Sequence, residues 1–162
     1  MLKVIVGADK LGAGLKDQVR HHLLAQGIAV QDVTPDNEFD YSRVGYEVGQ
    51  RVASGEFTQG FIFGSTGMGE SIMANRYSGV YCALCESLKS TRLARELNNA
   101  NVLAMGSRIV APKLATQMVD VFLATPFSQG THEEPNLAAN FEHAQSMERQ
   151  ITQEQQNTKQ EQ

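Results

Sequence analysis

The sequence predicts an α/β protein in which helices cover both faces of a five-stranded parallel sheet, giving three layers. Two observations predict this fold. Short apolar runs typical of buried strands alternate along the chain with segments whose apolar residues recur at helical spacing. Glycine, proline and polar residues mark the boundaries between the two kinds of segment. The chain has 162 residues, a length at which one domain can bury a sizeable core.

Each expected strand is a short apolar run that ends at glycine or at polar residues. The first reads LKVIVGAD and ends in an acidic residue, and the third comes directly before a cluster of glycines. In chain order the expected strands are residues 2–9, 28–33, 60–63, 80–87 and 101–108.

The expected helices show an apolar face or a boundary residue. In the first helix, Leu15, Val19 and Leu23 recur at helical spacing, and Gly27 closes it. Pro112 begins the fifth helix, because proline is favoured in the first turn. Helices are expected over residues 15–24, 44–52, 90–97, 113–123 and 137–151, with one more from about residue 70.

We expect a single domain over residues 1–151. The remaining residues, 152–162, read TQEQQNTKQEQ and offer no large apolar side chain to bury. A polar segment of this kind cannot offset the entropy lost on ordering, so the sequence predicts a disordered tail.

Composition argues against several kinds of partner. The net charge is -4 and the basic residues do not cluster, which speaks against nucleic acid or an anionic membrane as the main partner. No apolar stretch is long enough to span a bilayer. The N-terminal segment reaches Gly7 too early for the apolar region of a signal peptide, so a cytoplasmic location is expected.

The two cysteines, Cys82 and Cys85, lie in one expected strand. Residues with this spacing point to opposite faces of a sheet, so the pair is not expected to hold a metal or form a disulfide. Both thiols are predicted to be small buried apolar groups.

The strongest chemical signal lies in residues 59–76, QGFIFGSTGMGESIMANR. Gly64, Gly67 and Gly69 interrupt the chain between an apolar strand and a helix. Glycines let main-chain N–H groups approach a ligand closely, and the first turn of the helix adds unpaired donors. The loop is expected to hold an anion, either a bound phosphate or the negative oxygen of a reaction intermediate.

Glu70 follows this loop, and two interpretations of it stay open from the residues alone. A carboxylate in the first turn of a helix can simply complement the helix dipole. It can also be a base that abstracts a proton beside its own oxyanion hole.

In a parallel sheet, ligands bind at the carboxyl ends of the strands, near the point where the strand order reverses. Polar residues and glycines that follow four of the expected strands should therefore meet at one edge. They are Asp9, Lys10, residues 64–70, Glu86, Ser87 and residues 106–108.

Four motifs occur in a specific order and spacing over about residues 1–132: GADKLG near the start, the pair Asp40 and Tyr41, GSTGMGESIMANR, and NNANVLAMGSR from Asn98. Together they resemble the ribose-5-phosphate isomerase B and galactose-6-phosphate isomerase family of aldose–ketose isomerases. The resemblance implies a Rossmann-like three-layer fold, active sites shared by two subunits, and no metal or nucleotide cofactor.

The resemblance also implies roles for individual residues. Family members use either a cysteine at the position of Gly64 or a glutamate at the position of Glu70, so Glu70 becomes the catalytic base here. Main-chain N–H groups of residues 65–69 become the oxyanion hole, and Ser65 and Thr66 help to orient the sugar. The residues implied to contact substrate are Asp9, Lys10, Tyr41, Gly67, Met68, Gly69, Asn98, Arg108 and His132.

The chain departs from the family pattern at several positions. Lys10 stands where a histidine is usual, and Leu97 stands where a histidine helps to open the sugar ring. Thr131 and Pro135 replace two arginines that clamp the substrate phosphate, which should weaken phosphate binding or change the terminal group of the substrate.

Four residues near these departures keep two interpretations each. Lys10 is either a replacement charge for phosphate or a solvated lysine. Arg108 is either a phosphate ligand or the ion-pair partner of Glu86 or Asp9. Asp9 either orients a hydroxyl or caps the next helix, and His132 either reaches across a dimer or is an exposed loop residue.

These observations favour a sugar-phosphate isomerase that acts as a homodimer or tetramer on ribose 5-phosphate or a related aldose phosphate. One alternative is a subunit of a heteromeric galactose-6-phosphate isomerase-like enzyme, with sites completed by a paralogous subunit. Another is a non-catalytic ligand-binding or nucleotide-binding module, although the loop matches neither phosphate-binding glycine pattern of nucleotide-binding proteins.

Overall fold

The computed structural model describes residues 2–160 of the chain. The strands are β1 (Lys3–Ala8), β2 (Ala29–Asp32), β3 (Gly60–Gly64), β4 (Cys82–Leu84) and β5 (Val102–Gly106). The helices are α1 (Ala13–Ala25), α2 (Tyr41–Ala53), α3 (Met68–Ala74), α4 (Leu88–Asn98), α5 (Pro112–Ala124) and α6 (Leu137–Gln160). Strand and helix alternate as far as α5, as the sequence predicts.

The five strands form one parallel sheet in the order β2-β1-β3-β5-β4. β3 is central and pairs with β1 on one side and with β5 on the other. After β2 the chain returns to the opposite side of β1, so the strand order reverses between β1 and β3. The predicted five-stranded parallel fold is confirmed, and the loops after β1 and β3 meet where such sheets bind ligands.

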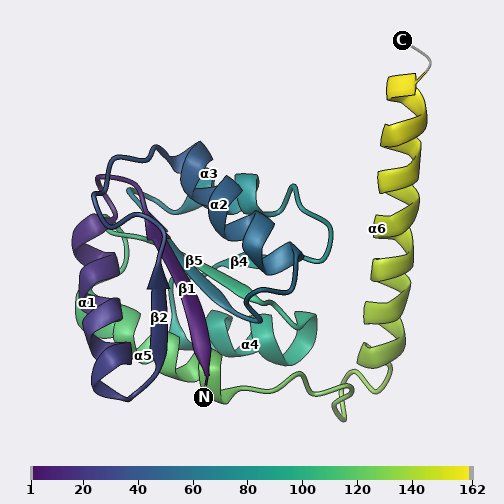
Figure 1. The fold of residues 1–162 in the computed structure, drawn as a ribbon. Coiled ribbons are helices and arrows are strands. Elements are labelled where there is room, and N and C mark those ends of the chain that lie inside the picture. Colours follow the sequence, from purple (N-terminus) through teal and green to yellow (C-terminus); the bar gives the residue numbers. More distant parts are fainter. Residues whose placement is uncertain (1, 161–162) are drawn as a thin grey trace.

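Helices cover both faces of the sheet, with α1, α4 and α5 on one face and α2 and α3 on the other (Figure 1). Alternate residues of a strand pack against the helices on the two faces of the sheet, because successive side chains along a strand point to opposite faces. Val4 and Val6 of β1 pack with α1 and α5, whereas Ile5 packs with Val44 and Val48 of α2.

The two cysteines follow the same alternation. Cys85 is buried in the core on the α1 and α5 face, and Cys82 packs against the core on the α2 face. Both are free thiols. Burial raises the pKa of each thiol, so neither is prepared to act as a thiolate at neutral pH.

α6 stands beside the three layers instead of covering the sheet (Figure 1). Glu148 anchors it, since its carboxylate accepts hydrogen bonds from the Gly79 N–H and the Tyr81 hydroxyl, both at 3.0 Å. The ring of Phe141 packs against Tyr81 and Phe127, with centroid distances of 5.2 and 5.3 Å. These contacts join α6 to the turn before β4 and to the loop that follows α5.

The sequence prediction ends this last helix too early. α6 continues to Gln160, so the segment predicted to be a disordered tail is helical as far as residue 160, and residues 161 and 162 lie outside the described part. Glutamine, glutamate and lysine are good helix formers, and Gln150 donates a hydrogen bond to Glu154 one turn later. Local helix propensity therefore orders a segment that has no core to bury.

Within residues 2–160, none of the helices combines the length and the apolar character needed to cross a bilayer.

Candidate active site

Three loops meet at the carboxyl edge of the sheet. They follow β1, β3 and β5. The Asp9 N–H donates to the Phe63 carbonyl at 3.1 Å, and the Ser107 N–H donates to the Gly64 carbonyl at 2.9 Å. The Ser107 hydroxyl donates to the Leu11 carbonyl at 2.8 Å. These bonds hold the three loops together as one rigid edge.

The loop after β3 turns into α3 at Gly67. This residue is buried and has φ of 76°, a left-handed conformation that favours glycine. The turn places Ser65 and Thr66 half-buried at the edge, with the Arg108 N–H bonded to the Ser65 carbonyl at 3.0 Å. α3 begins at Met68, slightly earlier than predicted.

Glu70 lies in the first turn of α3 and points into the protein. Its exposed fraction is only 2%, and its Oε1 atom has no hydrogen-bond partner among the described residues. Burial raises the pKa of the Glu70 carboxyl above its ordinary value, and the nearby Asp9 raises it further. A carboxylate that only complemented the helix dipole would not need to leave water, so its burial calls for another explanation.

Asp9 is half-buried beside Glu70 and accepts a hydrogen bond from the Gly12 N–H at 2.7 Å. It therefore holds the turn that leads into α1. The sequence left two roles open for Asp9, capping the next helix or orienting a substrate hydroxyl. The hydrogen bond from Gly12 agrees with the first role, and the position of the carboxylate close to Glu70 is compatible with the second.

Tyr41 and the first residues of α3 form the outer rim of the site. The Tyr41 ring lies directly on Gly69, where a Cβ would approach Tyr41 Cδ2 to 2.6 Å. Tyr41 and Met68 are both exposed, at 52% and 49%. The apolar rim is therefore open to solvent or to another chain.

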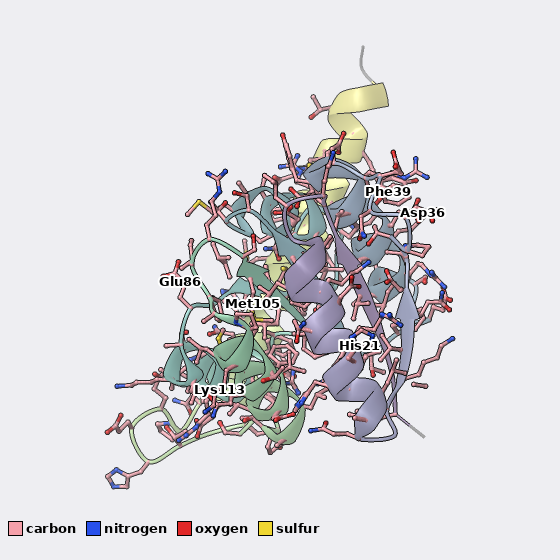
Figure 2. The ribbon with its side chains drawn as sticks, turned by 90° about the vertical axis from the view of Figure 1, so that its left-hand side faces the viewer. His21, Asp36, Phe39, Glu86, Met105 and Lys113 are labelled. Carbon is pink, nitrogen blue, oxygen red and sulfur yellow. The ribbon has the colours of Figure 1, made fainter. Side chains whose placement is uncertain are left out.

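Lys10 and Arg108 are exposed at the same edge. Lys10 lines a cleft of about 350 Å³ together with Asp36, Asn37 and Glu38. In the view of Figure 2, Asp36, which follows β2, and Glu86, which follows β4, lie on opposite sides, with the buried Met105 of β5 between them. In the described part of the chain Arg108 makes no ion pair with Glu86 or Asp9, so its guanidinium is available to a ligand.

Asn98 and His132 are not part of this edge. Asn98 is the last residue of α4, and His132 lies in the loop between α5 and α6. Each helix starts at the carboxyl edge of the sheet and runs back to the amino edge, so both exposed residues lie at the end opposite to Glu70. One chain therefore carries the expected sugar-contacting residues in two separate places.

Thr131 shapes the loop that carries His132. Its hydroxyl accepts a hydrogen bond from the Glu134 N–H, and its own N–H donates to the Glu134 carbonyl, both at 2.9 Å. The segment is a closed local turn with two acidic residues, Glu133 and Glu134. It offers no fork of donors for a phosphate.

Sequence reasoning missed one buried charge that supports the edge. Lys16 is completely buried, and its Nζ donates to the Thr34 carbonyl at 2.7 Å and pairs with Asp32 Oδ2 at 2.8 Å. The signal was its place next to the apolar stripe of Leu15 and Val19 on α1. A lysine there is easily taken for a solvated neighbour of the stripe.

Among the described residues, no group of three or more His, Cys, Asp or Glu side chains is arranged to hold a metal ion.

A buried carboxylate with a raised pKa, set beside a glycine loop at the reversal point of a parallel sheet, defines a class of small-molecule enzyme that works by proton transfer. Comparison with known proteins identifies the family. Residues 4–136 match the family model described as Ribose/Galactose Isomerase. The chain belongs to this family of aldose–ketose isomerases.

Individual relatives agree with this assignment. The chain is 36% identical over 135 residues to the 4-deoxy-4-sulfo-D-erythrose isomerase of Clostridium sp. (strain MSTE9), covering 82% of this chain and 85% of the relative. It is 35% identical over 136 residues to ribose-5-phosphate isomerase B of Escherichia coli (strain K12), covering 83% and 91%. The solved structure of Clostridium thermocellum ribose-5-phosphate isomerase B superposes with a TM-score of 0.85 at 34% identity, covering 93% of this chain and 99% of that one.

Proposed function

We propose that this protein interconverts an aldose and a ketose that carry a terminal anionic group, by proton transfer through a cis-enediolate with Glu70 as the base. The observation that carries the proposal is the state of Glu70, which is 2% exposed and has a carboxylate oxygen without a partner. Desolvation of this kind raises the basicity of a carboxylate toward the range useful for proton abstraction at neutral pH.

The proposed reaction needs no group beyond the chain and its substrate. Glu70 takes the proton from C2, the electrons of that C–H bond form the C1–C2 double bond, and the former carbonyl oxygen becomes negative. The O2 hydroxyl proton then passes to O1, and the Glu70 carboxylic acid protonates C1 to give the ketose. Main-chain N–H groups of residues 65–69 would stabilise the negative oxygen, and Ser65 and Thr66 would hold the adjoining hydroxyls.

We infer that two chains build each site. Glu70 and Asp9 lie at the carboxyl edge, whereas Asn98 and His132 lie at the amino edge, so one chain cannot bring them to the same sugar. A homodimer in which the amino edge of one chain faces the carboxyl edge of the other would complete the site. The exposed side chains of Tyr41 and Met68 at the rim favour such a contact. A cytoplasmic location stays a prediction.

A substrate with four carbons agrees best with the departures from the family pattern. Leu97 stands at the position of the ring-opening histidine, so the site favours a sugar that is already open. A four-carbon aldose with a phosphate or sulfonate on C4 has no free C4 hydroxyl to close a five-membered ring. The relative from Clostridium sp. (strain MSTE9) is named for a sugar of this kind. Ribose 5-phosphate, which closes such a ring, is the contrasting substrate.

The test is exchange of the C2 proton in deuterated water, followed by NMR with erythrose 4-phosphate, 4-deoxy-4-sulfo-erythrose and ribose 5-phosphate. The natural protein should incorporate deuterium, fastest with a four-carbon sugar, and Glu70→Gln should lower the rate about 100-fold or more. Glu56→Gln, which changes an exposed glutamate paired with Arg51, is the matched control and should keep the full rate. Full activity of Glu70→Gln would refute the role of the base.

The separation of Asn98 from Glu70 also supports a second candidate, in which a paralogous subunit completes the site. The purified protein decides between the two. Isomerase activity of the single gene product excludes the need for a paralogue, whereas activity that appears only with a second, related chain supports it.

A further inference from the structure

We propose that Gly64 is the positioning residue of this site, because the space left by its missing side chain is the space that the Glu70 carboxylate occupies. The effect on catalytic rate rests on the function proposed above, but the position of the carboxylate does not. Gly64 has no atom that could take part in the chemistry, and it acts only through Glu70.

The contact is closer than any side chain could tolerate. A Cβ built on Gly64 would lie 2.0 Å from Glu70 Oε1, 2.3 Å from Cδ and 2.4 Å from Oε2. All three of the nearest atoms therefore belong to the carboxyl group of Glu70. A methyl group at position 64 and the carboxylate in its present place exclude each other.

The main chain at Gly64 cannot move away to make room. Gly64 pairs with Gly106 in the register between β3 and β5, and its carbonyl accepts the Ser107 N–H at 2.9 Å. On another side, Gly12 presses against the same peptide, since a Cβ on Gly12 would lie 2.4 Å from the Phe63 carbonyl carbon and 2.7 Å from the Gly64 nitrogen. The sheet and the start of α1 thus fix this peptide in place.

The glycines around the edge differ in the atoms with which an added Cβ would clash. At Gly12 and Gly106 an added Cβ would meet main-chain atoms, which cannot rotate away. At Gly64 it would meet the end of a flexible glutamate side chain, which can turn toward solvent. Substitution of Gly64 should therefore leave the fold intact and relocate the carboxylate.

The experiment compares Gly64→Ala with Gly14→Ala. A Cβ on Gly14, near the start of α1, would meet no atom within 4 Å, so this control adds the same methyl group without a contact. The carboxyl carbon of Glu70, assigned by its absence in Glu70→Gln, is titrated by NMR. We expect its pKa to stay raised in Gly14→Ala and to fall toward the ordinary value in Gly64→Ala, because the carboxylate has moved into water.

The rate measurements follow the same logic. Gly64→Ala should lower kcat about 100-fold with a smaller change in KM, and Gly14→Ala should leave both unchanged. In the Glu70→Gln background, Gly64→Ala should cause little further loss, because the two residues act through one carboxylate. An unchanged pKa of Glu70 in folded Gly64→Ala, or a full kcat, would overturn the proposal.

Two further results keep the outcome decisive. If the natural protein exchanges no proton with any sugar, the proposed function fails, but the titration of Glu70 still decides where Gly64 places the carboxylate. If Gly64→Ala does not fold, the double variant Gly64→Ala/Glu70→Ala removes the clashing atoms and should fold. If the double variant also failed to fold, the methyl group at position 64 would clash with atoms other than those of Glu70, and the proposal would be overturned.

Discussion

At the scale of single residues, Glu70 combines burial with an unpaired oxygen, two conditions that oppose stability. A carboxylate with 2% exposure has lost its water, and Oε1 gains no hydrogen bond in return within the described residues. Groups that lower the stability of the fold are concentrated at functional sites, because the same burial that destabilises them makes them reactive.

The raised pKa of Glu70 predicts how stability depends on pH. Below the ordinary glutamate pKa of 4.5, Glu70 is protonated in both the folded and the unfolded chain, so its ionisation adds no cost. As pH rises, the unfolded chain releases this proton first, and the folded state loses stability until its own raised pKa is passed. Glu70→Gln should therefore gain stability relative to the natural protein as pH rises above 4.5.

Thermal unfolding of the two proteins across this pH range measures the difference. Glu56→Gln provides a control of opposite sign, because the hydrogen bond from Arg51 lowers the pKa of Glu56. A melting temperature of Glu70→Gln that tracks the natural protein at every pH would mean that the carboxylate is not buried in solution.

At the scale of elements, the loop after β2 depends on the buried Lys16 of α1. Its ammonium group binds the Thr34 carbonyl, Asp32 and the Asn37 Oδ1 atom, the last at 2.9 Å. The Thr34 hydroxyl accepts the Ala8 N–H at 2.9 Å, which ties the same loop to the end of β1. One lysine thus connects α1, β2 and the edge that carries Asp9.

Replacing Lys16 by methionine should therefore destabilise the protein by about 3 kcal/mol, because Asp32 and the Thr34 carbonyl lose their buried partner. Urea unfolding measures the loss. Lys113→Met, at an exposed position in the first turn of α5, should change stability by less than about 0.5 kcal/mol. Equal effects of the two substitutions would show that the Lys16 ion pair contributes nothing.

The sequence predicted the elements well where periodic apolar residues mark a buried face. Leu15, Val19 and Leu23 are all buried on α1, and Val44 and Val48 are buried on α2. Boundaries were less accurate, because a strand extends only as far as its ladder pairing, and β4 pairs with β5 only over Cys82–Leu84, within a longer apolar run. The length of α6 was underestimated because the prediction rested on the lack of apolar side chains to bury and not on the helix propensity of the segment.

The candidate site was predictable only in part. The glycine loop and Glu70 were visible as a local pattern, and the topology rule brought Asp9 to the same edge. The role of Gly64 was not visible, since a distance between a missing side chain and a carboxylate exists only in three dimensions. The resemblance implied a site shared by two subunits, but the sequence did not show which residues come from which edge; α4 and α5 carry Asn98 and His132 to the edge opposite to Glu70.

At the scale of the whole molecule, the residues of the proposed site are divided between the carboxyl edge and the amino edge of the sheet. This division can be tested by mixing inactive variants. Glu70→Gln damages the carboxyl edge and His132→Ala damages the amino edge. If each site takes one edge from each of two chains, a mixed dimer has one site with both changes and one site with neither.

Co-expression of these two variants should therefore restore activity to about a quarter of the natural level, although each variant alone is impaired. Tagging the two chains differently and purifying the mixed dimer should raise the activity to about half. Co-expression of two copies of the same variant is the control. If the mixed dimer stays as inactive as its parents, each chain builds its site alone.

The strand order also has a consequence for synthesis of the chain. β4 pairs only with β5, and β5 lies between β4 and β3. As the polypeptide leaves the ribosome, β1, β2 and β3 can assemble at once, but β4 must wait without a neighbour until Val102–Gly106 has emerged. During that interval the open side of β3, with its apolar run from Phe61 to Phe63, is the place where a nascent chain of this protein is most exposed to mispairing.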